Sequence, residues 1–449
     1  MAQEPLFEPW NDPSEKPLIQ FKNVTKRFGD FIAIDDLTQD IYEKEFFALL
    51  GPSGCGKTTM MRMLGGFETP TSGTISIAGQ DMNNVPPNKR AVNMMFQSYA
   101  LFPHLSIYEN IAFGLRRTDM AKDAIDARVN EMLKLTRLEK FAQRKPHQIS
   151  GGQRQRVALA RSLAKAPKLL LLDEPLGALD KKLRQDTQFE LMDIQEKTGT
   201  TFVIVTHDQE EAMTVASRVA VMDEGRIIQV ATPDAIYEAP NSTYVADFIG
   251  DVNLIKGTAE LRVSSKPAEQ TTPETLEAPA DPFVDDTPRP QPNKLGEWLH
   301  DKVLSPIIGE RDEPIKRLPP PSAAELTATP EVTSDIPEGG IALNWSDQHP
   351  AIIVSNGDEA QDGKALTFAI RPEKLNIAKD KPDAANALQG TVIDIAYLGN
   401  VSTYHVELKG GQMIKAQMAN ARRLAKRDIT WEDTVWVSFT DTAGVLLER

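Results

Sequence analysis

Residues 51–58 read Gly-Pro-Ser-Gly-Cys-Gly-Lys-Thr, and this stretch decides the fold class of the chain. It fits the pattern G-x-x-x-x-G-K-(S or T), with an apolar run of strand length before it (FFALL, 46–50) and a stretch of helical character after it (TTMMRML, 58–64). Its glycines let backbone amides wrap around phosphate groups. The start of the following helix adds the positive end of the helix dipole. The stretch therefore predicts a phosphate-binding loop between a strand and a helix.

Three side chains of this loop stand out. Lys57 is expected to reach the β- and γ-phosphates of a nucleotide, and Thr58 is expected to hold Mg²⁺. Cys55 is the one cysteine of the chain, and its small size suits a tight loop. A single cysteine also excludes a disulfide framework and a zinc site built from cysteines.

Two more motifs follow downstream. Leu169-Leu-Leu-Leu-Asp-Glu174 is an apolar strand that ends in two acids, so Asp173 is expected to reach the metal and Glu174 to polarise an attacking water. Ile149-Ser-Gly-Gly-Gln-Arg154 precedes a helix and predicts an anion-binding helix N-terminus. Alone, each motif also fits an ordinary loop or an ordinary helix cap. Their order after the phosphate-binding loop makes the functional interpretation the better one.

Strands and helices alternate from residue 18 to about residue 240, which predicts a parallel sheet with helices on both faces. The stretch 106–165 lacks strand patterns, and its helical periodicity predicts a subdomain, about 98–165, that interrupts this sheet. Its expected helices cover Ile107–Leu115, Ala121–Leu135 and Gln153–Ala164. Beyond it we expect a polar helix (180–198), a buried strand (202–206), a helix from Asp208 and a strand (218–222).

The pattern of predicted secondary structure changes near residue 243. Short strand patterns separated by turn residues predict a small β-barrel in the C-terminal part. These patterns lie at 252–257, 341–345, 351–355, 366–370, 391–398, 402–408, 412–418 and 434–439.

Charge is distributed unevenly along the chain. The net charge is −14, and residues 258–340 contain 16 Asp and Glu against 8 Lys and Arg, together with 14 of the 31 prolines. Such a segment cannot bury enough apolar surface to offset its ordering entropy, so it is expected to be disordered. Within it, 294–304 has an apolar stripe at helical spacing, which fits a short helix on the barrel, a mobile segment or a partner site.

Composition also limits the class of protein. An acidic balance disfavours a nucleic-acid binder, whose usual footprint is a basic face. No apolar run approaches the length of a membrane span, and the acidic, proline-rich residues 1–17 do not fit a secretory signal. The sequence therefore predicts a reducing, cytoplasmic compartment, with residues 1–17 as a disordered tail.

The order of these motifs resembles that of an ATP-binding-cassette ATPase over about residues 18–240. The resemblance implies a P-loop NTPase of the α/β class, with a RecA-like core and a helical subdomain. It gives Gln97 a contact with Mg²⁺ and a role in sensing the transmembrane partner, and His207 a contact with the γ-phosphate. Asp180, in Gly-Ala-Leu-Asp (177–180), would face a second cassette. Phe28 occupies the place of the aromatic residue that stacks on adenine, where the family more often has Tyr.

The resemblance also implies a complete set of site residues. The catalytic group comprises Glu174, His207 and Lys57. Mg²⁺ would be held by Thr58, Gln97 and Asp173. ATP would be bound by Phe28, Gly51, Pro52, Ser53, Gly54, Cys55, Gly56, Lys57, Thr58, Thr59 and Gln97, and in trans by Ser150, Gly151, Gly152, Gln153 and Asp180 of a second chain.

The C-terminal part resembles the OB-like regulatory domain of bacterial importer ATPases, in the stretches 244–257 and Ala369-Ile-Arg-Pro-Glu-Lys374. The resemblance implies a cassette domain at 18–243 and an all-β OB-like domain at 244–449 that is interrupted at about 258–340. Within such importers, the sequences at 94–115, 145–165 and 393–420 are most similar to the polyamine (putrescine) importer ATPases.

That resemblance implies partners and a location. We expect a second cassette subunit, identical or not, two integral-membrane permeases and, indirectly, a periplasmic polyamine-binding protein. The location would be the cytoplasmic face of the bacterial inner membrane, with no nucleic-acid partner. An alternative is the same role in a sugar, sulfate or ferric-iron importer. A remote alternative is a soluble cassette protein that acts on ribosomes or DNA.

Overall fold

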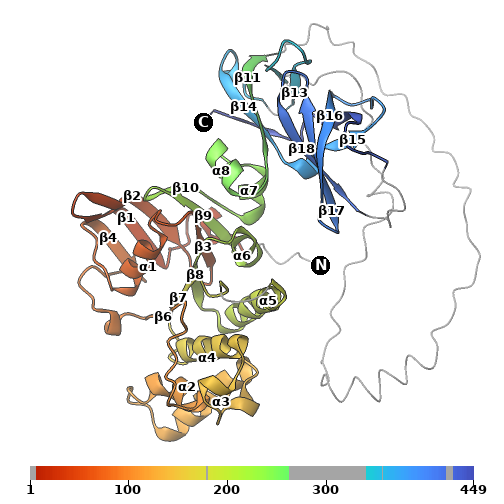
Figure 1. Cartoon of the computed structure of the whole chain (residues 1–449). Helices are drawn as coiled ribbons and strands as arrows, with labels where there is room; N and C mark the ends of the chain where they lie inside the picture. The colour runs from red at the N-terminus through yellow and green to blue at the C-terminus, as the bar shows by residue number, and fades with distance from the viewer. Residues whose placement is uncertain (1–6, 178–180, 262–339, 356, 421–427, 449) are drawn as a thin grey trace, which may run out of the picture. The chain divides into compact units, whose positions relative to one another are not determined.

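The computed structural model describes residues 7–177, 181–261, 340–355, 357–420 and 428–448. Three expectations fall outside these ranges: the position of Asp180, the disorder expected for nearly all of the acidic segment, and the helix expected at 294–304. The described residues form the two parts that the sequence predicts, an α/β cassette followed by an all-β C-terminal part (Figure 1).

A six-stranded sheet is the centre of the cassette, with strand order β10-β9-β3-β8-β7-β6. Neighbouring strands from β9 to β6 run parallel, and β10 pairs with β9 in the antiparallel sense. The predicted parallel sheet is thereby confirmed. The strands are β3 (Phe46–Leu50), β6 (Val92–Met95), β7 (Leu169–Asp173), β8 (Thr201–Thr206), β9 (Arg218–Asp223) and β10 (Arg226–Ala231).

Side chains of these strands alternate between two hydrophobic cores. In β3, Phe46, Ala48 and Leu50 join one core, while Phe47 and Leu49 join the other. Each core is completed by other elements: helices of the second half of the cassette on one face, and α1 with a second sheet on the opposite face. Because both faces are covered, the strands are apolar almost throughout, as parallel strands usually are.

The second sheet of the cassette is antiparallel, with order β2-β1-β4-β5. The sequence pattern predicted one parallel sheet for residues 18 to about 240 and did not predict this second sheet. Strands β1 and β2 are joined by a tight turn at Gly29 and Asp30, which only antiparallel neighbours allow. The strands are β1 (Ile19–Phe28), β2 (Phe31–Ile41), β4 (Ser72–Ile77) and β5 (Gln80–Asp81).

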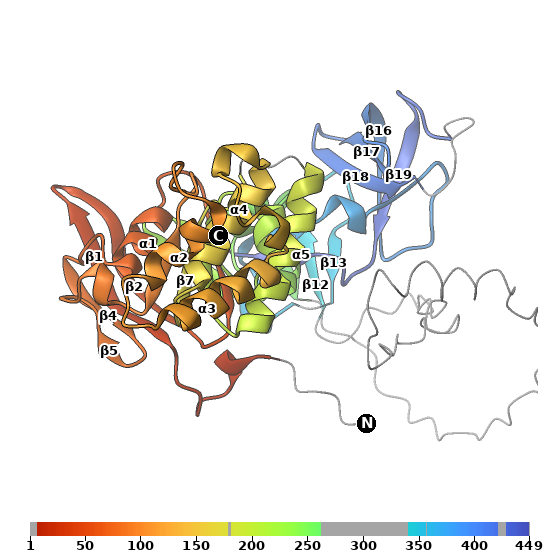
Figure 2. The ribbon, with the colours of Figure 1, turned by 90° about the horizontal axis from the view of Figure 1, so that it is seen from below.

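The helices of the cassette form two groups. Helix α1 (Lys57–Gly65) packs its methionines into the core between the two sheets. Helices α2, α3 and α4 lie together as the predicted helical subdomain (Figures 1 and 2). Their bounds are Ile107–Leu115, Lys122–Leu135 and Gly151–Leu163, followed along the chain by α5 (Lys181–Thr198) and α6 (Gln209–Val215).

The C-terminal part consists of two five-stranded antiparallel sheets, with orders β13-β12-β11-β14-β20 and β15-β19-β16-β17-β18. Apolar side chains from both sheets share one core, which confirms the OB-like prediction. Figure 2 shows β16, β17, β18 and β19 side by side. The first sheet contains β11 (Asn253–Leu261), β12 (Ile341–Asn344), β13 (Ile352–Val354), β14 (Ala365–Ile370) and β20 (Val445–Leu447). The second contains β15 (Asn376–Ala378), β16 (Asn386–Tyr397), β17 (Val401–Leu408), β18 (Met413–Ala419) and β19 (Thr434–Phe439).

Strands β11 and β12 flank the acidic segment. They pair in the antiparallel sense, and their last paired residues are Leu261 and Ile341. The two points at which the chain leaves and re-enters the described sheet are therefore direct neighbours.

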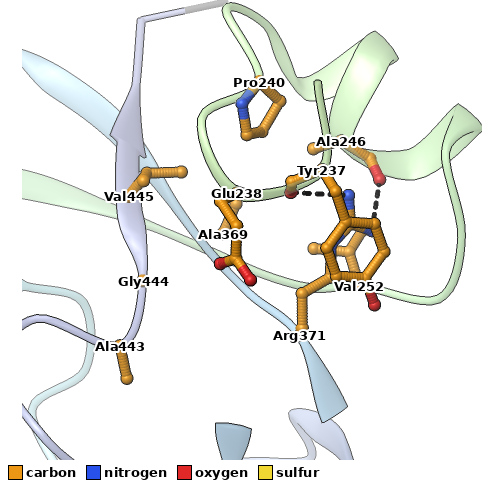
Figure 3. Close-up of a pocket in the computed structure, with 10 residues that line it drawn as sticks. All are labelled: Tyr237, Glu238, Pro240, Ala246, Val252, Ala369, Arg371, Ala443, Gly444 and Val445. Atoms are coloured by element: carbon orange, nitrogen blue, oxygen red, sulfur yellow. Dashed lines mark hydrogen bonds between the residues drawn. The ribbon is translucent and has the colours of Figure 1, made fainter. Parts of the chain in front are cut away.

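Two short helices that the sequence patterns did not predict connect the parts, α7 (Pro233–Glu238) and α8 (Thr243–Phe248). The buried guanidinium of Arg371, just after β14, donates to the carbonyl oxygens of Ala246 (2.8 Å), Gly250 (3.2 Å) and Tyr237 (3.3 Å), as Figure 3 shows in part. It also lies 4.3 Å from the centre of the Tyr237 ring. The motif Ala369–Lys374 thus connects the β-rich part to the end of the cassette.

Residues 7–17 run up to the first strand and include a short 3₁₀ helix at Pro9–Asn11. The ring of Trp10 lies 4.8 Å from the guanidinium of Arg218, which is paired with buried Glu45 at 2.7 Å. Trp10 therefore has a specific packing site on the cassette. In the described residues, every helix is too short or too polar to cross a membrane.

Candidate functional site

The phosphate-binding loop runs from the end of β3 to the start of α1. Gly54 and Gly56 have φ angles of 86° and 107°, a region that favours glycine. A Cβ atom at Gly56 would lie 2.6 Å from the carbonyl oxygen of Ala33, so strand β2 also excludes a side chain there. The loop is anchored from behind, because the amide of Gly225 donates to the carbonyl of Cys55 at 3.0 Å. The loop backbone is thus fixed in one shape.

The ammonium of Lys57 is held inside this loop. It donates to the carbonyl oxygens of Gly51 (2.7 Å) and Pro52 (2.8 Å), and the side chain is buried. Cys55 is also buried, with its sulfur 3.6 Å from that ammonium. These short contacts place a positive charge in a loop whose shape suits phosphate oxygens. The neighbouring Ser53, Gly54 and Thr58 are exposed, and Thr59 is half-buried.

Gln97, Glu174 and His207 lie at the same edge of the parallel sheet as the loop. Strands β3, β8, β7 and β6 are parallel neighbours, so their carboxyl ends lie at the same edge. Gly51 follows β3, His207 follows β8 and Glu174 follows β7, while Gln97 comes two residues after β6. This edge is where open α/β sheets bind their ligands.

Glu174 is the centre of the polar contacts at this edge. One carboxylate oxygen accepts from the amide nitrogen of Gln97 at 2.8 Å, and the other lies 3.0 Å from Nδ1 of His207. The backbone of Glu174 has a φ of 43°, which is unfavourable for a residue with a side chain and typical of functional sites. Its amide donates to the carbonyl of Val205 on the next strand at 2.9 Å, which holds this conformation. Both oxygens of the carboxylate are thereby fixed in direction.

Asp173 ends strand β7, one residue before Glu174. Burial raises the pKa of its carboxyl, the neighbouring charge of Glu174 raises that pKa further, and the charge of Arg62 opposes the rise. A cation nearby would favour the ionised form of the Asp173 carboxyl.

Residues that fit Mg²⁺ are present beside the loop. The carboxylate of Asp173, the hydroxyl of Thr58 and the amide oxygen of Gln97 are the hard oxygen donors that Mg²⁺ prefers. The amide nitrogen of Gln97 is used by Glu174, which leaves its amide oxygen for a cation. The part of the chain that the structure describes has no cluster of three or more His, Cys, Asp or Glu that could hold a metal. The oxygen donors of Thr58, Asp173 and Gln97 suit Mg²⁺, which shares its ligands with substrate phosphates and few carboxylates.

Phe28 ends β1 in an exposed position, at 46 % of its maximal surface. The ammonium of Lys26 lies 4.7 Å from the centre of its ring. The ring is exposed and lies outside the hydrophobic core, and its stacking on adenine stays a prediction.

The Ser-Gly-Gly-Gln stretch forms the N-terminus of α4. Ser150 caps the helix by accepting from the amide of Gln153 at 3.3 Å, and the side chain of Gln153 accepts from the amide of Ser150 at 3.0 Å. Gly151 and Gly152 form the first turn. Among the described residues, no hydrogen bond or ion pair connects this stretch to residues 51–59 of the same chain.

The helical subdomain is tied to the segment that carries Gln97. Arg161 of α4 donates to the carbonyl oxygens of Ala100 (2.8 Å) and Tyr99 (2.9 Å), and its guanidinium lies 5.6 Å from the centre of the Phe102 ring. Tyr99 and Ala100 both have positive φ angles. The turn after Gln97 is thus held by the helix that begins at Ser150.

The predicted set missed a polar group behind Glu174. Thr206, Asp208, Glu211 and Arg184 line a cavity together with Glu174 and His207. Asp208 was expected only as the start of a helix. A glutamate in the short run Gln-Glu-Glu-Ala (209–212) gives no signal that it is buried, so the sequence could not single out Glu211.

The profile of the family described as "ABC transporter" matches residues 34–177, and that of the "TOBE domain" matches residues 368–447. The putrescine transport ATP-binding protein of Escherichia coli (strain K12) is 44% identical over 432 residues, which cover 96% of this chain and 95% of that protein.

Two relatives named as spermidine/putrescine import ATP-binding proteins are also similar over most of the chain. The one from Rubrobacter xylanophilus is 46% identical over 407 residues, covering 91% of this chain and 88% of that protein. The one from Pseudomonas aeruginosa (strain UCBPP-PA14) is 41% identical over 433 residues, covering 96% and 99%.

Proposed function

The chain belongs to the ABC transporter family as the ATP-hydrolysing subunit of an importer, and from this premise we propose that it drives the uptake of putrescine or spermidine. The observation that supports a polyamine as the cargo is the sequence identity of 41–46% to polyamine import proteins over nine-tenths or more of the chain. That similarity includes the C-terminal part as well as the cassette.

The ATP site is completed by a second copy of the chain. One chain has one phosphate-binding loop and one Ser-Gly-Gly-Gln helix start, and among the described residues no hydrogen bond or ion pair joins the two. In a twofold dimer each helix start, from Ser150 to Gln153, would close on the γ-phosphate held by the other chain, since helix N-termini bind anions. Asp180 would face the partner across the same interface.

The chemical step follows from the contacts of Glu174. Its carboxylate accepts a proton from the attacking water, with both oxygens directed by Gln97 and His207. Lys57 stabilises the charge on the β- and γ-phosphates, for which it would exchange its contacts with Gly51 and Pro52. His207 would contact the γ-phosphate from the end of β8.

Thr58, Asp173 and Gln97 would hold Mg²⁺, which when bound neutralises phosphate charge. Phe28 would stack on the adenine ring.

Coupling to the membrane subunits would run through the turn after Gln97. Gln97 contacts the catalytic base directly, and Arg161 connects the following turn to α4. A change at Glu174 can therefore reach the helical subdomain through contacts already present. The partners would be two permeases and, through them, a periplasmic polyamine-binding protein, with the chain at the cytoplasmic face of the inner membrane.

Glu174→Gln tests the assignment of the base. The amide keeps the shape of the side chain but cannot accept a proton, so we expect ATP binding to persist while turnover falls at least about a hundredfold. The measurements are ATP binding by equilibrium dialysis, phosphate release, and molar mass by light scattering with ATP and Mg²⁺. The variant should dimerise with ATP, and turnover near that of the wild type or a persistent monomer would contradict the proposal.

The cargo is tested in vesicles that contain the complete transporter. Putrescine or spermidine with its binding protein should stimulate ATP hydrolysis, and Glu174→Gln should abolish both hydrolysis and uptake. Stimulation by a sugar, sulfate or ferric iron instead of a polyamine would leave the ATPase role intact and refute the cargo.

A further inference from the structure

Glu211 is a buried acid close to the catalytic edge. It lies in α6, four residues after His207, and only 2% of its surface is exposed. One carboxyl oxygen accepts from the hydroxyl of Thr206, while the other has no hydrogen-bond partner among the described residues. Such a group is costly to bury, so its presence calls for an explanation.

Hydrogen bonds connect Glu211 to both neighbours of His207. The hydroxyl of Thr206, which donates to Glu211, also accepts from the amide of Asp208 at 2.9 Å. The carboxylate of Asp208 accepts from the amide of Glu211 at 3.0 Å and pairs with Arg184 of α5. His207 lies between the two bridged residues, and its Nδ1 lies 3.0 Å from Glu174. Glu211 is thus hydrogen-bonded to both residues that flank His207 in the chain, Thr206 and Asp208.

Glu211 lines the same cavity as Glu174 and His207. Glu174, His207, Arg184 and Glu211 line a space of about 40 Å³, which is enough for more than one water molecule. In such a confined space a charge on Glu211 acts strongly on its neighbours. The charged or titratable groups that face it are Asp208 on its own helix start, Arg184 on α5, and His207 and Glu174 after β8 and β7.

The charge of Glu211 changes in the neutral range. Burial raises the pKa of its carboxyl to about 7, with the Asp208 charge adding to the rise, while the hydrogen bond from Thr206 and the charges of Arg184 and His207 oppose it. A carboxylate accepts the hydroxyl hydrogen of Thr206 more strongly than a neutral acid does.

We propose that Glu211 is a positioning residue for ATP hydrolysis, which holds His207 against Glu174 through Thr206 and Asp208, and that it does so best as a carboxylate. The proposal rests on the roles proposed above for Glu174 and His207. It predicts that turnover depends on the charge of a residue that touches neither ATP nor the attacking water.

The matched pair Glu211→Gln and Glu210→Gln tests this charge. Both variants remove one acid from α6, but Glu210 is exposed. We expect Glu211→Gln to lower kcat about five- to tenfold at pH 8, with KM for ATP nearly unchanged, because a neutral acceptor holds Thr206 less firmly. The rise of wild-type kcat between about pH 6 and pH 8 should be lost in Glu211→Gln and kept in Glu210→Gln.

The pair Thr206→Val and Thr206→Ser tests the bridge. Valine removes the hydroxyl that connects Glu211 to Asp208, whereas serine keeps it. Thr206→Val should lower kcat and flatten the pH profile as Glu211→Gln does, and Thr206→Ser should restore both. Equal behaviour of the two Thr206 variants would overturn the proposal.

Unfolding by urea at several pH values supplies a readout without activity. Folded Glu211 keeps its proton to a higher pH than the unfolded chain does, so it favours the folded state at low pH. The contribution of Glu211 to the free energy of unfolding is lost as the pH rises from about 4.5 through about 7. This pH-dependent loss of stability should be absent from Glu211→Gln.

Wild-type kcat and an unchanged pH profile in Glu211→Gln would overturn the proposal. Failure of the base assignment is distinguishable, because Glu174→Gln would then still hydrolyse ATP.

Discussion

At the scale of single residues, the site depends on backbone geometry as much as on reactive groups. Glu174 stands at a φ of 43°, and Gly56 at 107° with strand β2 directly behind it. The carbonyl of Val205 on the neighbouring strand accepts the amide of Glu174, and the carbonyl of Ala33 leaves no room for a side chain at Gly56. The reactive groups are therefore directed before any ligand binds.

Gly56→Ala tests this restriction. The added Cβ would lie 2.6 Å from the oxygen of Ala33 at a left-handed φ, so we expect a loss of about 2–4 kcal/mol in the free energy of unfolding and loss of ATP binding. Gly79→Ala is the control, since its φ of 76° is also left-handed but its Cβ meets no atom within 4 Å. It should cost only about 1 kcal/mol. If urea unfolding gave the same loss of unfolding free energy for both variants, strand β2 would be shown to move aside for the added methyl group.

Much of the site could be predicted from the sequence for a specific reason. Gln97, Glu174 and His207 each follow a strand, and parallel strands bring their carboxyl ends to one edge. Their convergence is a consequence of strand order. The burial of Glu211 could not be predicted, because it depends on how α6 packs on its neighbours and not on any residue pattern in α6.

At the scale of elements, the connection between the cassette and the β-rich part depends on one side chain. Arg371 donates to carbonyl oxygens of Tyr237, Ala246, Gly250 and Asp251, which belong to α7, α8 and the turn after α8. Sequence patterns found β14 but missed α7 and α8, because helices of six residues show too little periodicity. The alternation of strands and helices predicted one parallel sheet for residues 18 to about 240 and did not predict the antiparallel sheet β2-β1-β4-β5.

Arg371→Ala tests this connection. It would leave several buried carbonyl oxygens without a donor, at a cost of about 2–4 kcal/mol, and we expect calorimetry to resolve separate unfolding transitions for the two parts. Arg371→Lys should rescue little, because an ammonium cannot reproduce the guanidinium fork. The control is Lys374→Ala, which removes only an exposed pair with Glu238 at 2.9 Å and should cost less than about 1 kcal/mol. A single transition with wild-type midpoint in Arg371→Ala would contradict this role.

At the scale of the whole molecule, the sequence patterns distinguish the α/β cassette, the all-β C-terminal part and the acidic segment between strands β11 and β12. The alternation of strands and helices predicted the parallel sheet, and the switch to short strands near residue 243 predicted an all-β part. More than half of the net charge of −14 belongs to residues 258–340, whose net charge is −8, so the acidity of the chain says little about its catalytic surface.

The pairing of Leu261 with Ile341 has a consequence for how this protein can vary. Because antiparallel neighbours can be joined by as few as two residues, the sheet imposes no minimum length on what connects them. It imposes little upper limit either, since doubling the length of a flexible loop costs only about 0.6 kcal/mol. The hairpin is thus a natural site of insertion: a lineage, or an engineer, could exchange everything between these two residues for another sequence without disturbing the sheet.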